Sequence, residues 1–189
     1  MSAYAKHLVK AAILLVSASL CAQEVYRPDP DVLVRLAYSN APFASESADR
    51  QICLAVSRDG DYRILRLQND GQTVRLQGKM PEEQLKQLRS LLDAKDFRKL
   101  SGDHGGLIRQ ESESFAAELP RDENRSWQTH WLNADGERPF PSPVAKVVDW
   151  IKNFRPTNGK PFEYIEYPQV CPKEGLRYLQ PSVATNEHP

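Results

Sequence analysis

Residues 80–100, MPEEQLKQLRSLLDAKDFRKL, decide the fold that this sequence predicts. Pro81 suits a first helical turn, because its missing N–H has no intrahelical partner there, and the two glutamates that follow it complement the positive end of the helix dipole. Phe97 and Leu100 extend the apolar stripe into a last, tighter turn. The stripe itself consists of leucines at helical spacing, Leu85, Leu88, Leu91 and Leu92. A helix with one apolar face needs a sheet to cover.

Candidate strands lie on both sides of this helix. Residues 51–57 alternate apolar and small side chains, and Asp59-Gly60 is a strong hairpin signal. The further predicted strands cover residues 62–68, 73–78, 114–119 and 127–132.

A second helix is predicted from Ser142 and Pro143, as N-cap and first helical residue, with a stripe of valines and Ile151. The element order is therefore β-β-β-α-β-β-α. We expect an α+β fold, a two-layer sandwich with a mostly antiparallel sheet and both helices packed on one face.

The N-terminus has the pattern of an export signal. A basic stretch precedes the apolar run 11–20, which is too short to span a bilayer, and small residues follow it. Residues 1–22 are therefore predicted to be a signal peptide cleaved after Ala22, giving a periplasmic or secreted protein with no transmembrane segment in the mature chain. Lipidation of Cys21 is the alternative, which Leu20 directly before it disfavours.

The rest of the chain divides into three predicted parts. Residues 23–50 are expected to form an irregular N-terminal arm with at most one added strand, at 32–38. Residues 51–155 form the α+β core domain, and residues 156–189 a proline-rich tail. Lys+Arg and Asp+Glu are both 25, so the composition gives no basic footprint for nucleic acid.

Removing the signal leaves an even pair of cysteines, Cys53 and Cys171. In an oxidising compartment such a pair predicts a disulfide. The alternative is a small buried strand residue at Cys53 and a free thiol on the tail at Cys171.

The most site-like stretch is Asp103-His104-Gly105-Gly106, within the glycine-bearing loop 101–109. Asp beside His can orient an imidazole, and glycines allow a ligand to approach closely. His130, on a predicted strand, is the second candidate binding residue and could meet His104 in space. The competing interpretations are a structural loop and a solvent-facing strand histidine.

No catalytic, metal or cofactor motif accompanies these residues. The sequence has no GxSxG, SxxK, GxGxxG or phosphate-binding loop, and no compact pair of zinc ligands. We therefore expect no enzyme activity, no metal and no cofactor.

The segment around the first helix resembles a known family. Its letters follow the pattern L-x-G-K-(L/M)-x-x-E-(Q/E)-L-x-x-L-x-x-L-L-x-x-x-D-F-x-x-L, carried here by Leu76, Gly78, Lys79, Met80, Glu83, Gln84, Leu85, Leu88, Leu91, Leu92, Asp96, Phe97 and Leu100. With the glycine loop, strand pair and closing helix behind it, the pattern resembles small exported bacterial domains of unknown function. It is also similar to the emfourin family of inhibitors of thermolysin-like metalloproteases. The resemblance implies inhibition of an exported protease.

Three functional classes follow. The leading expectation is an exported, non-enzymatic binding protein whose partner is a protease or another envelope protein, engaged through the loop 101–109 and the open face of the sheet. The second is a hydrolase or metal-binding protein in which Asp103, His104 and His130 converge in a pocket. The third is a structural envelope protein.

Overall fold

The computed structural model describes residues 31–40, 49–104, 113–122, 125–133, 139–162 and 171–172. The elements in these ranges are β1 (Val32–Ser39), β2 (Asp49–Ser57), β3 (Asp61–Gln68), β4 (Thr73–Lys79), α1 (Glu82–Asp93), α2 (Lys95–Arg98), β5 (Gly102–His104), β6 (Glu113–Asp122), β7 (Arg125–Asn133), α3 (Ser142–Asn153) and β8 (Lys160–Pro161).

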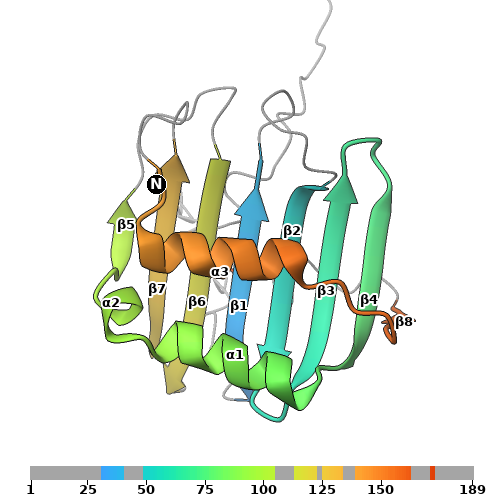
Figure 1. The fold of residues 1–189 in the computed structure, drawn as a ribbon, viewed down its shortest axis with the longest axis horizontal. Coiled ribbons are helices and arrows are strands. Elements are labelled where there is room, and N and C mark those ends of the chain that lie inside the picture. The colour runs from blue at the N-terminus through green and yellow to red at the C-terminus, as the bar shows by residue number, and fades with distance from the viewer. Residues whose placement is uncertain are drawn as a thin grey trace, which may run out of the picture.

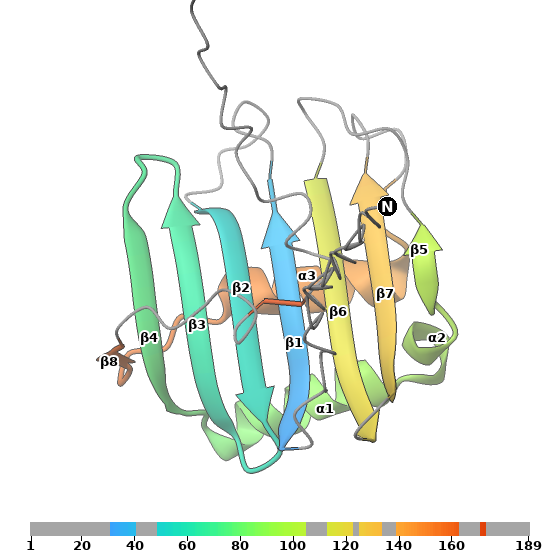
Figure 2. The same cartoon turned by 180° about the vertical axis from the view of Figure 1, so that it is seen from behind.

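The described strands form one sheet, and both long helices cover the same face of it. The strand order is β5-β7-β6-β1-β2-β3-β4-β8, antiparallel throughout except for the parallel pair β5–β7. Helices α1 and α3 run across the strands in front of the sheet (Figure 1). Seen from behind, the strands lie in front of the helices (Figure 2). The predicted α+β two-layer architecture is confirmed.

Strands β2, β3 and β4 form the predicted meander, and a glycine closes each of its hairpins. Gly60 has φ 92° and its amide donates to the carbonyl oxygen of Ser57 at 3.1 Å, while Gly71 has φ 83°. Both conformations are left-handed and suit glycine because it has no Cβ to clash. The hairpin predicted from Asp59-Gly60 is therefore confirmed.

Strand β1 corrects the expected boundary of the core. The sequence predicts an irregular arm over residues 23–50 with at most one added strand, at 32–38. That strand is present as β1, but it lies between β2 and β6, near the centre of the sheet. This strand joins the β2–β3–β4 meander to the β6–β7 hairpin. Its place follows from period-2 alternation, since Val34, Leu36 and Tyr38 all point to the helix face and are completely buried. The core therefore begins well before residue 51.

The single helix predicted over residues 80–100 is instead two helices. Ala94 has extended backbone, with φ −55° and ψ 126°, and separates α1 from α2. The break has a packing reason, because in a continuous helix Phe97 would point roughly 140° away from Leu92 around the axis. After the break, Phe97 is completely buried and its ring lies 5.1 Å from that of Trp127.

The main core lies between the sheet and the helix layer. The predicted apolar stripes supply it, although Leu91 is only partly buried. Each fully buried aliphatic side chain there contributes roughly 1.5–3 kcal/mol. Helix α3 starts one residue earlier than predicted, with Pro141 at the N-cap position and Ser142 as the first helical residue. The buried stripe residues are Leu85, Leu88, Leu92, Val144, Val147, Val148 and Ile151.

A buried arginine from the sheet holds the C-terminal end of α3. Arg66, on β3, donates from Nη2 to the carbonyl oxygens of Ile151 at 2.8 Å and Phe154 at 2.6 Å. Its Nη1 lies 2.5 Å from Oδ2 of Asp49, which also pairs with Arg155 at 2.6 Å. Burial lowers the pKa of Arg66 to about 10, so the guanidinium stays charged at neutral pH. Carbonyl groups that lack donors within the helix are thus satisfied by the sheet.

The face of the sheet away from the helices also carries a buried cluster. Its members are mostly small, and their exposed fractions lie between 0% and 8%. The expectation that this face stays open for a partner is therefore wrong at its centre, where the disulfide fixes another part of the chain to it. The cluster consists of Ala37, Cys53, Ala55, Leu65, Ala116 and Cys171.

Candidate binding site

A cavity of about 290 Å³ lies on this second face, over β5, β6 and β7. Residues 102–104, predicted as part of a loop, form β5, which pairs in parallel with β7. Three strands and the residue after Cys171 therefore build the cavity. Its described lining consists of Gly102, Asp103, Ala116, Ala117, Glu118, Gln128, Thr129, His130 and Pro172.

The cavity contains a histidine–carboxylate pair. Asp103 and His130 are register partners on β5 and β7, and Oδ1 of Asp103 lies 2.9 Å from Nδ1 of His130. The imidazole side chain is 5% exposed and the carboxylate side chain 69% exposed. The sequence interpretation of His130 as solvent-facing is therefore wrong, because its face of the sheet is covered. The pair can fix the orientation of the imidazole.

His104 does not join this pair. Consecutive strand residues point to opposite faces, so Asp103 faces the cavity and His104 faces the helix layer. There the His104 ring stacks on Trp131, with ring centroids 4.0 Å apart and an interplanar angle of 16°. Because His130 and Trp131 alternate on β7, the two histidines lie on opposite sides of the sheet.

The structure therefore does not bring together the three side chains of the hydrolase or metal hypothesis. Across the described residues, no group of three or more His, Cys, Asp or Glu side chains is placed to hold a metal ion. Gly105 and Gly106, the other two predicted site residues, lie outside the described residues.

A charged pair that the sequence analysis missed borders the cavity. Arg35 on β1 and Glu118 on β6 are cross-strand partners, and Nη1 of Arg35 lies 3.8 Å from Oε1 of Glu118. Their side chains are only 6% and 1% exposed. The sequence carries a signal for this pair, because Arg35 is the one charged residue in 32–38 and Glu118 the one charged residue in 114–119, and both predicted strands are otherwise mostly apolar. Buried charges of this kind are retained when they are paired.

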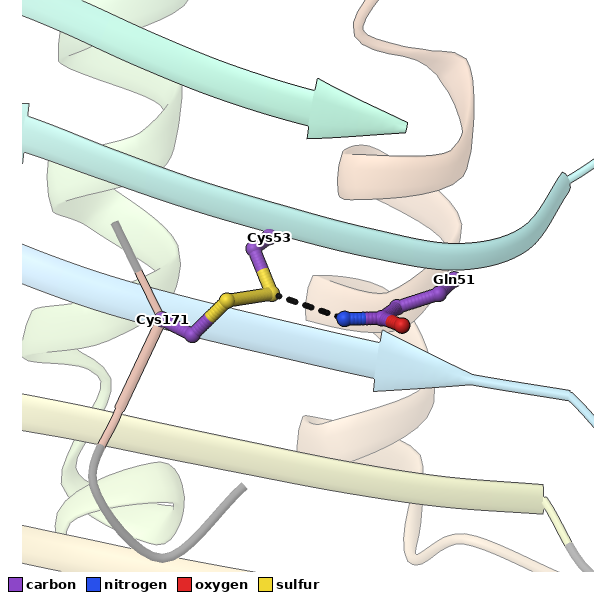
Figure 3. The surroundings of a disulfide bond; sticks show 3 residues. All are labelled: Gln51, Cys53 and Cys171. Carbon is purple, nitrogen blue, oxygen red and sulfur yellow. Dashed lines mark hydrogen bonds between the residues drawn. A yellow bond between two sulfur atoms is a disulfide. The ribbon is translucent and has the colours of Figure 1, made fainter. Parts of the chain in front are cut away.

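The predicted disulfide is present and positions one wall of the cavity. Cys53 and Cys171 are bonded at a sequence separation of 118, with their Cα atoms 5.0 Å apart. Both cysteines are completely buried. Gln51 donates from Nε2 to the sulfur of Cys53 at 3.5 Å (Figure 3). Because Pro172 directly follows Cys171, the disulfide fixes this residue of the lining.

A second hollow lies between the two helices. It has a volume of about 390 Å³, and Trp150 forms part of it, with its indole Nε1 donating to Oε1 of Gln87 at 3.1 Å. The Trp150 ring stacks on Phe154 at 5.2 Å between centroids. Its rim carries Lys146 and Asp149, so charges of both signs are present. This mixture does not indicate a ligand class.

Comparison of the chain with protein-family models and with curated proteins finds no match. The resemblance to the emfourin family therefore stays a prediction. In the part of the chain that the structure describes, no helix is long and apolar enough to cross a membrane.

Proposed function

We propose that this chain is an exported, non-enzymatic binding protein that engages its partner through the cavity over β5, β6 and β7. The observation that carries this proposal is the cavity itself. Its polar side chains come from three strands that follow one another along the chain, β5, β6 and β7, and its wall at Pro172 is tied to the sheet by the Cys53–Cys171 disulfide. A site built on strands and braced by a covalent bond loses little conformational entropy on binding.

Export is supported by the same disulfide, because structural disulfides persist in oxidising compartments. The partner that we propose is an exported protease or another envelope protein. The most specific form of this proposal is inhibition of a thermolysin-like metalloprotease, and it rests on the resemblance of residues 76–100 to the emfourin family.

A capture experiment with paired variants tests the proposal. The tagged mature protein is incubated with its own periplasmic and secreted fractions, and the bound proteins are quantified by mass spectrometry. Gln128→Trp fills the cavity from a half-buried position, while Asp149→Ala changes an exposed residue on α3. We expect one stoichiometric partner that Gln128→Trp loses and Asp149→Ala retains. A partner retained by both variants would refute the role of the cavity.

The inhibitor version is tested separately with purified protein and a thermolysin-like protease. We expect inhibition that Gln128→Trp weakens and Asp149→Ala leaves intact. If the protease keeps full activity at a large excess of the protein, the inhibitor version is wrong, and the more general binding proposal is judged by the capture experiment.

A further inference from the structure

We infer that Asn158-Gly159 is a site of spontaneous deamidation, and that its isoaspartate product releases β8 from β4. Strand β8 lies at the edge of the sheet opposite β5 (Figure 1), so this inference does not depend on the proposed function of the cavity. Asparagine is a chemically labile residue. A glycine after it offers the least hindered backbone nitrogen, because glycine has no side chain.

The reaction is an intramolecular displacement. The Gly159 amide nitrogen attacks Cγ of Asn158, an N–C bond forms, and the bond from Cγ to Nδ2 breaks. The proton of the attacking amide leaves with the departing nitrogen as ammonia. Water then opens the cyclic imide at either of its carbonyl groups, which gives aspartate or isoaspartate. The closeness of the two groups along the chain replaces a second reactant.

The structure leaves both reacting groups available. Asn158 is exposed to water, between α3 and β8. Among the backbone hydrogen bonds of the described residues outside regular helices and strands, none is donated by the Gly159 amide. The Thr157 hydroxyl donates to Oδ1 of Asn158 at 3.4 Å, which places a donor at the oxygen where negative charge develops during the attack.

Asn153 provides a comparison within the same molecule. It is also exposed, but it is the last residue of α3, and its Nδ2 donates to the carbonyl oxygen of Asp149 at 2.8 Å. The amide that would have to attack, that of Phe154, donates to the carbonyl oxygen of Trp150 at 2.9 Å. A hydrogen-bonded amide and a bulky following residue both slow the reaction. We therefore expect modification at Asn158 well before modification at Asn153.

The isoaspartate product does not fit the place that Gly159 occupies. A Cβ added to Gly159 would lie 2.8 Å from Cβ of Leu76 and 2.8 Å from the hydroxyl oxygen of Tyr62, so the backbone is closely packed there. In isoaspartate the main chain passes through the side-chain carbon of residue 158 and gains one methylene group before Gly159. The added length has no space next to Leu76 and Tyr62, so the chain must move away from them.

Strand β8 is weakly held and is therefore the part that moves. Lys160–Pro161 pairs with β4 only at Gln77 and Leu76, and both residues of β8 are exposed. Proline supplies no N–H to the ladder. Loss of this pairing leaves the β4 edge open at these positions, and an open edge can pair with another chain. Deamidation thus converts a covered sheet edge into an open one as the protein ages.

The test ages the mature, disulfide-bonded chain in mildly alkaline buffer. Peptide mass spectrometry with electron-transfer fragmentation locates deamidation and distinguishes isoaspartate from aspartate. We expect isoaspartate at Asn158 while Asn153 stays intact. In the isoaspartate form, hydrogen exchange of the amides at residues 76–77 and 160 should be about fivefold faster or more, because a backbone hydrogen bond contributes about 1 kcal/mol.

Two variants separate the backbone change from the charge. Asn158→Gln needs a larger ring that closes more slowly, so the aged variant should exchange like fresh protein. Asn158→Asp introduces the same charge in an ordinary backbone, and the fresh variant should also exchange like fresh protein. If Asn158 stays intact in the folded chain, or reacts no faster than Asn153, the inference is wrong. Faster exchange in fresh Asn158→Asp, or unchanged exchange in the isoaspartate form, would overturn the release of β8.

Discussion

Replacing Arg66 by Met should destabilise the fold by about 3 kcal/mol. Two hydrogen bonds from its guanidinium to carbonyl oxygens at the end of α3 are lost, and bonds from charged donors contribute about 1.5–3 kcal/mol each. Removing one partner of a buried ion pair typically costs about 3–5 kcal/mol. The lower end applies here because Asp49 keeps its contact with Arg155 at 2.6 Å. Methionine preserves most of the apolar stem.

Urea unfolding followed by tryptophan fluorescence measures this loss. With an m-value of about 2 kcal/mol/M, a loss of about 3 kcal/mol lowers the unfolding midpoint by about 1.5 M. Arg155→Met is the matched control, because that side chain is 54% exposed and water weakens its pair with the buried Asp49, so its loss should cost less than the loss of Arg66. If Arg66→Met loses no more stability than Arg155→Met, the argument that Arg66 anchors α3 to the sheet is wrong.

Three further predictions concern the core and the disulfide. The mature chain should show no free thiol until it is reduced and two free thiols afterwards, and a free thiol in the oxidised protein would contradict the disulfide. Replacing Cys53 and Cys171 by serine should lower the free energy of unfolding by about 5 kcal/mol, because the bond closes a loop at a sequence separation of 118. Phe97→Ala should lose about 3–5 kcal/mol in urea unfolding and alter the near-ultraviolet circular dichroism of Trp127, and an unchanged spectrum would show that the two rings do not pack. Burial, and secondly the hydrogen bond to Glu113, raise the pKa of Tyr38 far above its usual value. The unfolded state therefore loses the phenolic proton at a lower pH than the folded state does, and the free energy of unfolding should fall as the pH rises above about 10. Tyr38→Phe should make that fall shallower, and an unchanged slope in alkaline unfolding curves would contradict it.

Periodicity predicted the elements whose side chains face the helix layer. The stripes of α1 and α3 and the alternation in β2 depend only on which residues are apolar, so the sequence specifies them locally. The break at Ala94 is not local. It depends on the position of Trp127, which lies on a strand thirty-odd residues later and packs against Phe97. Helix propensity alone therefore predicted one helix where packing produces two.

The candidate site was only partly predictable, because strand alternation decides which of its residues meet. Asp103 and His130 come together as register partners, whereas His104 is turned to the other face by its place next to Asp103. A loop over residues 101–109 would impose no such alternation, and for this reason the sequence alone allows a site of three residues. Because β5 is a strand, Asp103 pairs with His130 on one face of the sheet, and His104 stacks on Trp131 on the other face.

Strand β1 explains why the charged side of the cavity was missed. The sequence places residues 32–38 in an arm, at most as an added strand, and does not indicate which strand lies beside it, so Arg35 has no predicted neighbour. In the sheet, β1 lies beside β6 and sets Arg35 opposite Glu118. The same strand sends Leu36 into the main core. Arg35 and Leu36 thus link the charged pair beside the cavity to the packing of the helix layer. A shift of β1 by one residue in register would turn Arg35 towards the helix layer and Leu36 towards the second face, and would disrupt both the ion pair and the core.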